Sequence, residues 1–172
     1  RAVQAKVGVT VDGNPGPQTW TAIHRAIVGE VPTPTGSTTL ADERSERNIA
    51  TLLPQVQPLA RALIESAAAI GIASKVISGI RTYEEQNALY EQGRSKPGRI
   101  VTNARGGYSN HNFGIAFDIG VFDGGRYLDE SPAYKAVGAL GIKLGLEWGG
   151  NWKTIQDEPH FQFRPAWARD KS

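Results

Sequence analysis

The stretch SNHNFGIAFDIGV, residues 109–121, combines a strand pattern with polar side chains that could form a site. From Ile115 onward, large apolar residues occupy every second position, which is typical of a strand with one face buried in a core. On the opposite face, Asp118 stands between Ala116 and Gly120, two of the smallest residues. Their small size leaves open space above the carboxylate, where a metal ion could bind.

His111 can approach Asp118 only if the chain turns between them. In one continuous strand the two side chains would point to opposite faces, because they are an odd number of residues apart. Gly114 offers a break in the strand pattern. We therefore expect His111 to lie on a turn just before a strand over residues 115–122.

A second stretch, DEPHFQF at residues 157–163, repeats this division into an apolar and a polar face. In a strand, Phe161 and Phe163 point to one side, while His160 and Gln162 point to the other. Two distant segments therefore each offer a potential ligand opposite an apolar face. Two imidazoles and one carboxylate, with the fourth position left to water, are typical of an open zinc site.

Composition restricts the possible ligands. The 172 residues include three histidines and no cysteine, which excludes disulfide frameworks, cysteine zinc sites and thiol nucleophiles. His111, Asp118 and His160 are therefore the candidate ligands of a Zn²⁺ ion. The net charge is +2, and we expect no nucleic-acid partner because there is no run of Lys and Arg. No stretch approaches the roughly 20 apolar residues that span a bilayer.

Simpler interpretations of these residues remain open at this point. A His-x6-Asp or Asp-x-x-His spacing often arises by chance, and His160, beside two phenylalanines, could be a core-edge histidine with one hydrogen bond. We expect His24, on a helix beside a linker, to be structural or on the surface. Trp148 and Trp152 favour a packing role, although either could form the wall of a cleft.

The chain divides into three parts by composition. Residues 1–30 contain the turn-rich segment DGNPGP and a short helical pattern, and such a unit is too small to form a core alone. Residues 31–40 are rich in Pro, Gly and hydroxyl residues and indicate a linker, which leaves 41–172 as the main domain. Because the chain starts at Arg1 without an apolar leader, we expect it to be processed or an excised fragment.

The main domain is predicted to be α+β. Helix patterns cover about 56–70, closed by Gly71, about 82–92, opened by a capping box of Thr82 and Glu85, and about 131–140, opened by Ser131 and Pro132. Strands are expected at 75–78, 115–122, 147–148 and 160–163, and a loop at 93–107. Helices followed by short strands indicate a short antiparallel sheet that carries the zinc site, with helices packed on one side.

Three motifs together resemble a known peptidase family. They are SGIRT at 78–82, SNHNFGIAFD at 109–118 and DEPH at 157–160. The chain from roughly Leu53 to Arg164 is similar to the zinc D-Ala-D-Ala carboxypeptidase and L-alanyl-D-glutamate endopeptidase family, peptidase family M15. The sequence of the second motif looks most like that of the endopeptidase branch, which includes phage endolysins and wall-remodelling enzymes.

The resemblance implies a role for each motif residue. His111, Asp118 and His160 would bind zinc. Asp157 would be the catalytic base and Arg81 would assist at the substrate carbonyl. Many relatives carry Glu at the base position, and the shorter Asp fits the endopeptidase branch. Ser109, two residues before the first ligand, is expected to hydrogen-bond the substrate.

We therefore expect a zinc peptidase that cuts peptidoglycan stem peptides outside the cytoplasm, with the signal absent from this chain. The segment VDGNPGPQTW at 11–20 is similar to the second half of a peptidoglycan-binding repeat. Alternatives are a D-alanyl-D-alanine carboxypeptidase with the same metal site, a non-catalytic wall-binding module that keeps the zinc fold, and a metal-free α+β domain.

Overall fold

The computed structural model describes residues 42–164 of the chain. The predicted peptidoglycan-binding-like unit at 1–30, which includes His24, and the predicted linker at 31–40 lie outside the described residues. Residues 165–172 lie outside them as well. The division of the chain into these parts therefore stays a prediction.

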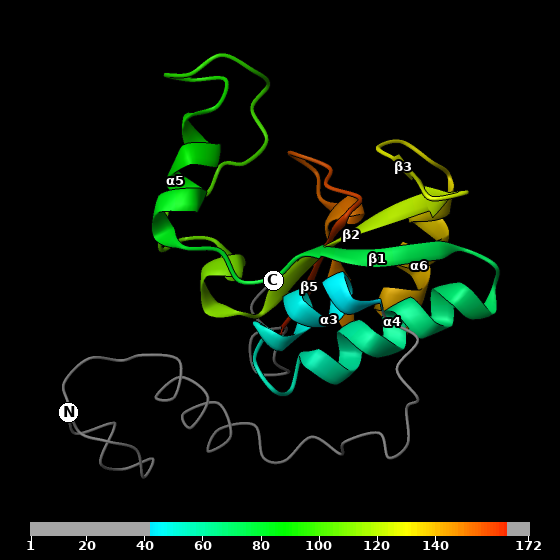
Figure 1. Ribbon diagram of the computed structural model, residues 1–172. Helices are drawn as coiled ribbons and strands as arrows, with labels where there is room; N and C mark the ends of the chain where they lie inside the picture. Colours follow the sequence, from blue (N-terminus) through cyan, green and yellow to red (C-terminus); the bar gives the residue numbers. More distant parts are fainter. Residues whose placement is uncertain (1–41, 165–172) are drawn as a thin grey trace, which may run out of the picture. The chain divides into compact units, whose positions relative to one another are not determined.

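A five-stranded antiparallel sheet forms the centre of the described domain (Figure 1). Its strands are β1 (Ala73–Ser78), β2 (Ala116–Asp123), β3 (Arg126–Leu128), β4 (Leu146–Trp148) and β5 (His160–Phe163). They follow the order β1-β2-β5-β4, and β3 pairs with the far end of β2. Strand β2, which contains Asp118, therefore contacts three other strands.

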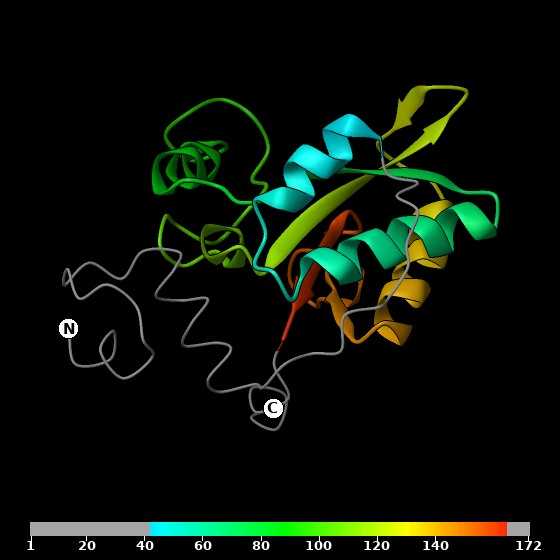
Figure 2. The ribbon, with the colours of Figure 1, turned by 60° about the horizontal axis from the view of Figure 1, so that its bottom comes forward.

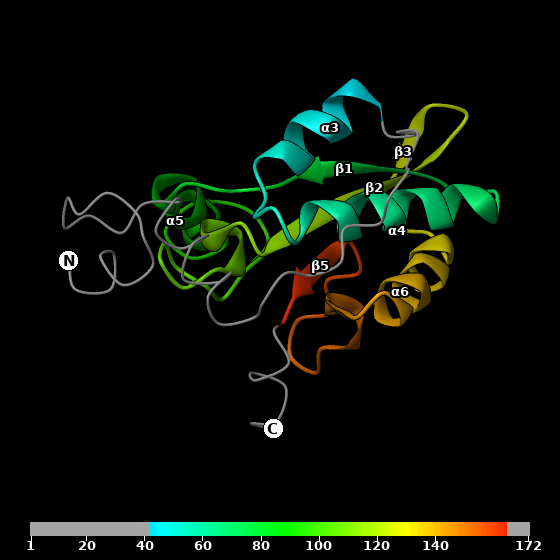
Figure 3. The same ribbon diagram turned by 90° about the horizontal axis from the view of Figure 1, so that it is seen from below.

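Three helices cover one face of this sheet (Figures 2 and 3). They are α3 (Glu43–Ala50), α4 (Gln57–Ala69) and α6 (Ala133–Lys143), and α4 lies between the other two (Figure 3). The core between helices and sheet includes Ile49, Leu63, Val76, Phe117, Ile119, Tyr134, Val137 and Phe161, all fully buried. The predicted α+β fold, with helices packed on one side of a short antiparallel sheet, is confirmed.

Helix α5 (Tyr83–Glu91) follows β1 and stands apart from the other three helices (Figure 1). It begins with the predicted capping box, because Thr82 Oγ1 accepts from the Glu85 amide and Glu85 Oε2 accepts from the Thr82 amide. The chain then returns to the sheet through residues 93–108. This excursion lies beside the end of the sheet that holds the candidate ligands, so it can form one side of the site.

Two predicted helices need correction at their ends. Helix α4 ends at Ala69, so Ile70 is its C-cap and is 54% exposed instead of extending the buried face. The glycine after it, Gly71, has φ +79, a left-handed conformation that favours glycine. Helix α6 begins at Ala133, one residue later than predicted, although Ser131 Oγ still accepts from the Ala133 amide.

Helix α3 and strand β3 were not predicted, and neither was the 3-10 turn η2 (Gly149–Asn151). The sequence of α3, ERSERNIA, is too polar for an apolar stripe, and only Ser45 and Ile49 are buried. Its place is set instead by a tertiary contact, because Ser45 Oγ accepts from the Val76 amide of β1 at 3.0 Å. Strand β3 is short, but the Gly124-Gly125 pair before it, with φ +54 and +85, is the signature of a tight hairpin turn.

No helix within residues 42–164 is long and apolar enough to cross a membrane.

Helix α6 packs closely on the sheet through a glycine. A Cβ added to Gly138 would lie 2.4 Å from Cδ2 of Trp148. That ring is 7% exposed and is held by a hydrogen bond from its Nε1 to the Glu158 carbonyl at 2.7 Å. Because both sides of the contact are fixed, the helix can approach β4 only with a glycine at this position.

We predict that Gly138→Ala destabilises the protein, although alanine favours a helix by about 1 kcal/mol over glycine. Overpacking against the fixed indole should cost roughly 1–3 kcal/mol. Urea unfolding followed by circular dichroism measures the change. Exposed Ala139 on the same helix provides the control, since Ala139→Gly should lose only the propensity difference. A stabilising effect of Gly138→Ala would contradict the packing described here.

Candidate metal centre

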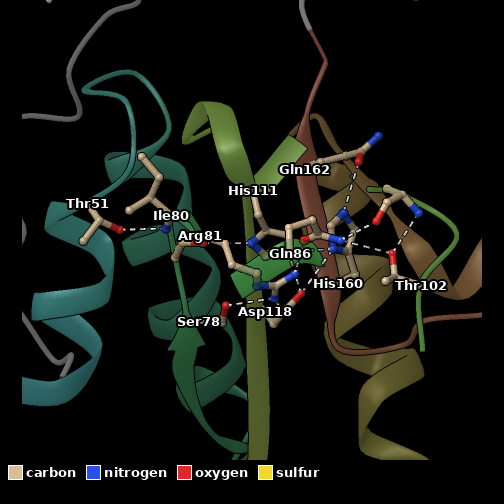
Figure 4. A network of polar contacts seen from close by, with 12 residues as sticks. Thr51, Ser78, Ile80, Arg81, Gln86, Thr102, His111, Asp118, His160 and Gln162 are labelled. Atoms are coloured by element: carbon tan, nitrogen blue, oxygen red, sulfur yellow. Dashed lines mark hydrogen bonds and ion pairs between the residues drawn. The ribbon is translucent and has the colours of Figure 1, made fainter. Parts of the chain in front are cut away.

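His111 lies on a turn immediately before β2, as the sequence predicted. Residues Asn110–Phe113 form one turn of 3-10 helix, η1, and Gly114 follows in a left-handed conformation with φ +66. The Leu53 amide donates to the Gly114 carbonyl at 2.9 Å, which anchors the turn to the segment before α4. His111 is 2% exposed, and its imidazole points toward the polar face of the sheet (Figure 4).

Asp118 and His160 face each other across two neighbouring strands. The antiparallel register of β2 and β5 pairs Asp118 with His160 and Phe117 with Phe161. The two phenylalanine rings stack at 5.8 Å on the core side. Because side chains alternate along a strand, the stacking of this apolar pair places Asp118 and His160 together on the opposite face.

The three candidate ligand atoms form a nearly equilateral triangle (Figure 4). His111 Nε2 is 3.2 Å from Asp118 Oδ1 and 3.2 Å from His160 Nδ1, and His160 Nδ1 is 3.1 Å from Asp118 Oδ1. A tetrahedral zinc with bonds of roughly 2.0–2.1 Å separates its ligand atoms by about 3.3–3.4 Å. The triangle therefore matches one face of such a tetrahedron to within a few tenths of an ångström.

Neutral imidazoles would leave no proton inside this triangle. His111 Nδ1 lies 2.8 Å from the Gly79 carbonyl, which can only accept, so the His111 proton belongs there. His160 Nε2 lies 3.1 Å from Gln162 Oε1, which also only accepts. His111 Nε2, His160 Nδ1 and Asp118 Oδ1 then direct three lone pairs at one point. A cation is the group that satisfies such a donor set.

Charge is concentrated around Asp118. Burial alone would raise its pKa, but the hydrogen bonds that His111 and His160 donate when protonated, in the absence of a metal, outweigh burial and hold the pKa well below its ordinary range. Its second oxygen, Oδ2, accepts from Arg81 Nη2 at 3.0 Å. Burial likewise opposes protonation of His160, yet the hydrogen bond and charge of Asp118 raise the pKa of that imidazole.

Asp157 lies beside the triangle without belonging to it. Its main chain is fixed, since its amide donates to the Gly149 carbonyl and its carbonyl accepts from the His160 amide, both at 3.1 Å. Burial and the nearby negative charge of Asp118 raise the pKa of the Asp157 carboxyl. Within residues 42–164 this carboxylate has no hydrogen-bond partner. It is thus placed to exchange a proton with a bound molecule.

Arg81 is positioned by a buried amide that the sequence did not reveal. Gln86 of α5 is fully buried and accepts from Arg81 Nη1 at 2.9 Å, while Arg81 Nη2 also donates to Ser78 Oγ (Figure 4). Gln86 Nε2 donates to Thr102 Oγ1 and the Ala104 carbonyl, which ties the 93–108 loop to the site. No local pattern marks Gln86, because only tertiary contacts bury it.

An open cavity of about 860 Å³ contains the triangle, Asp157, Arg81 and Ser109. Tyr108, 83% exposed, is one of the residues that line it. Trp152 also lines the cavity, lies 4.9 Å from the His160 ring and donates from Nε1 to Glu147 Oε1 at 2.9 Å. Trp152 therefore forms a wall of this cavity, whereas Trp148 is a packing residue. The cavity is large enough for several residues of a peptide.

Comparison with known proteins adds sequence relatives to this geometry. A profile of M15 peptidases described as D-alanyl-D-alanine carboxypeptidase matches residues 102–163. Over 126 residues the chain is 39% identical to the peptidoglycan L-alanyl-D-glutamate endopeptidase CwlK of Bacillus subtilis, a match that covers 66% of this chain and 74% of the relative. The chain belongs to the M15 peptidase family.

Two further proteins are similar to this M15 peptidase. The L-alanyl-D-glutamate peptidase of Listeria phage A118 is 33% identical over 124 residues, covering 70% of the chain. The match spans only 41% of that phage protein's length. The crystal structure of the L-Ala D-Glu endopeptidase ChiX of Serratia marcescens superposes with a TM-score of 0.57 and 26% identity, covering 71% of this chain and 87% of ChiX. The fold of this chain is thus an M15 fold.

All six residues singled out in the sequence lie around one cavity of the M15 domain: Arg81, Ser109, His111, Asp118, Asp157 and His160. His111, Asp118 and His160 form a cluster whose donor atoms suit a metal ion. The sequence did not single out Glu147 and Asn110, which lie in the same cavity. Glu147 faces the site side of β4 opposite Gln162, and alternation along that strand was the available signal.

We predict opposite effects of pH on the metal-free and the zinc-loaded protein. The pKa of His160 is raised in the fold, so its pairing with Asp118 stabilises the metal-free protein below about pH 6.5 and is lost as pH rises past the raised value. Zinc requires the neutral imidazole, so stabilisation by zinc should instead grow with pH. Thermal melts between pH 6 and 8, with chelator or with zinc, measure both trends.

Asp118→Asn is the matched control, because it removes the charge that raises the pKa of His160. This variant should lose the pH trend of the metal-free protein. A melting temperature of the metal-free wild type that rises between pH 6 and 8 would contradict the pairing.

Proposed function

We propose that this M15 peptidase uses zinc to hydrolyse peptidoglycan stem peptides at the bond between L-alanine and D-glutamate. The observation that carries the proposal is the triangle of three lone pairs, open to a cavity that also holds a carboxylate and a guanidinium. The bond is inferred from CwlK and the phage peptidase, whose names specify it. Such a substrate places the reaction outside the cytoplasm.

His111, Asp118 and His160 would hold the zinc ion, with a fourth position toward the cavity. The donor set fits, because two neutral imidazoles and one carboxylate leave Zn²⁺ an open coordination site. When bound, zinc supplies a Lewis acid for the scissile carbonyl and lowers the pKa of a water molecule toward about 7. The residues of the chain supply the remaining chemistry.

Asp157 would take the proton of the attacking water and deliver it to the leaving amine. Burial and the charge of Asp118 raise the pKa of this carboxyl, which makes its carboxylate a better proton acceptor than that of an ordinary aspartate. Its fixed main chain keeps the carboxylate beside the cluster. General base catalysis of this kind contributes about 10²–10⁴-fold to the rate.

Arg81 would face the oxygen that becomes negative during attack. Its guanidinium is held between Asp118, Ser78 and Gln86, so little reorganisation is needed when the charge develops. A well-placed donor of this type stabilises the transition state by roughly 3–4 kcal/mol. Ser109 lines the same cavity, and its hydroxyl does not cap η1, which supports a hydrogen bond to the substrate.

The chain would be divided into three parts. Residues 1–30 would be a partial peptidoglycan-binding-like unit, and 31–40 would act as a linker to the peptidase domain at 41–172.

We predict that a strong chelator abolishes hydrolysis of purified sacculi and that added zinc restores it. Mass spectrometry of the fragments identifies the bond, because an endopeptidase leaves a new N-terminal D-glutamate. Release of free D-alanine would instead indicate a D-alanyl-D-alanine carboxypeptidase, the activity named in the description of the matching family profile. Binding to sacculi without any cleavage would favour a non-catalytic wall module. Full activity in the presence of chelator would refute the metal.

We predict that Asp157→Asn keeps stoichiometric zinc but lowers kcat by about 10²–10⁴-fold, since the amide cannot accept the proton. Elemental analysis and hydrolysis of a defined stem peptide measure the two properties. Asp157→Glu retains a base and should recover part of the rate. Asp129→Asn, on the surface away from the cavity, is the control and should behave as wild type. An active Asp157→Asn enzyme would reassign the base.

A further inference from the structure

We propose that Asn110 and Gln162 form an amide pair that selects the tautomer of His160 able to bind the metal. Neither residue belongs to the ligand triangle, so both act as positioning residues through His160. The inference rests on the proposed zinc function. According to this proposal, the two amides determine whether His160 Nδ1 carries a lone pair or a proton.

The amide pair connects the two segments that carry the histidine ligands. Gln162 follows His160 by two residues on β5, faces the same side of the sheet and is 5% exposed. Its Oε1 lies 3.1 Å from His160 Nε2 and 2.7 Å from Asn110 Nδ2 (Figure 4 shows the first contact). Asn110 is the first residue of η1, directly before His111. One amide oxygen therefore receives hydrogen bonds from both segments.

The direction of these hydrogen bonds determines where His160 carries its proton. Gln162 Oε1 can only accept, so a neutral His160 must place its proton on Nε2. The lone pair is then on Nδ1, which points into the triangle. If both amides reversed, an N–H of Gln162 would face Nε2 and the proton would move to Nδ1. Nδ1 would then donate to Asp118 and could not bind a cation.

The two histidines differ in how this choice is made. His111 Nδ1 faces the Gly79 carbonyl, a main-chain acceptor that cannot turn around. The acceptor of His160 is a side-chain amide, which presents either an oxygen or an N–H by rotating about one bond. His160 is thus the ligand whose lone pair depends on a second residue, and Asn110 is the donor that favours the oxygen-inward arrangement.

Zinc affinity, measured by competition with a chromogenic chelator, tests the amide pair without using peptidase activity. Gln162→Leu removes the acceptor and should weaken zinc binding about 10–100-fold, the usual effect of losing a partner behind a metal ligand. Gln162→Glu should bind zinc at least as tightly as wild type, because a carboxylate offers oxygen on both sides, keeps the proton on Nε2 and adds a negative charge near the cation.

For Asn110→Asp, the proposal and simple electrostatics predict opposite changes in zinc affinity. An added negative charge near the site would by itself strengthen cation binding. However, the new carboxylate can only accept, so it should turn the N–H group of Gln162 inward and force the wrong tautomer of His160. We therefore expect zinc binding about tenfold weaker than wild type, of the size seen when such partners are altered. Affinity equal to or tighter than wild type would overturn the proposal.

Two controls separate this result from a loss of fold and from the proposed function. Gln92→Leu removes another amide of the same cavity and should leave zinc affinity unchanged. Melting of the metal-free variants reports folding independently. A wild type that binds zinc while Gln162→Leu binds it equally well overturns this inference alone. A wild type that binds no zinc would overturn the proposed metal function together with it.

Discussion

Three lone pairs directed at one point, with their atoms 3.1–3.2 Å apart, are the constraint on which the rest of the site depends. Without a cation they repel one another, and the metal-free protein can relieve that repulsion by placing a proton on an imidazole nitrogen inside the triangle. The fold must therefore hold the three groups together against this electrostatic repulsion. The apolar core supplies the free energy, and the turns and hydrogen bonds around the site supply the direction.

The register of two short strands transmits this constraint to the core. Phe117 and Phe161 stack beneath Asp118 and His160, and all four belong to one pairing of β2 with β5. A slip by one residue would turn His160 toward the helices and a phenylalanine toward the cavity. The burial of the phenylalanine pair on the core side thus fixes the positions of two ligands on the opposite, polar side of the sheet.

The residues around the triangle divide the chemistry between rigid and adaptable parts. Gln86 holds Arg81 and the 93–108 loop in one network, and Gly79 fixes His111 through its main chain. Asp157 differs, because its main chain is held while its carboxylate has no partner among residues 42–164. Hydrolysis of a bound peptide requires rigidly held groups that polarise the carbonyl and a base that is free to accept a proton, and both lie in the same cavity here.

The sequence by itself determined the two strands that carry Asp118 and His160, the glycine turn that brings His111 beside them, and the division of each strand into an apolar and a polar face. These features follow from local periodicity and from the conformations open to glycine, so no tertiary information was needed. The roles of Asp157 and Arg81 came from resemblance to a family. Only the tertiary structure decided that Ser45 anchors an otherwise polar helix, that Gln86 is buried behind Arg81, and that Asn110 and Gln162 meet. Those contacts join residues distant in the chain, and a polar side chain carries no local mark of the partner it will find.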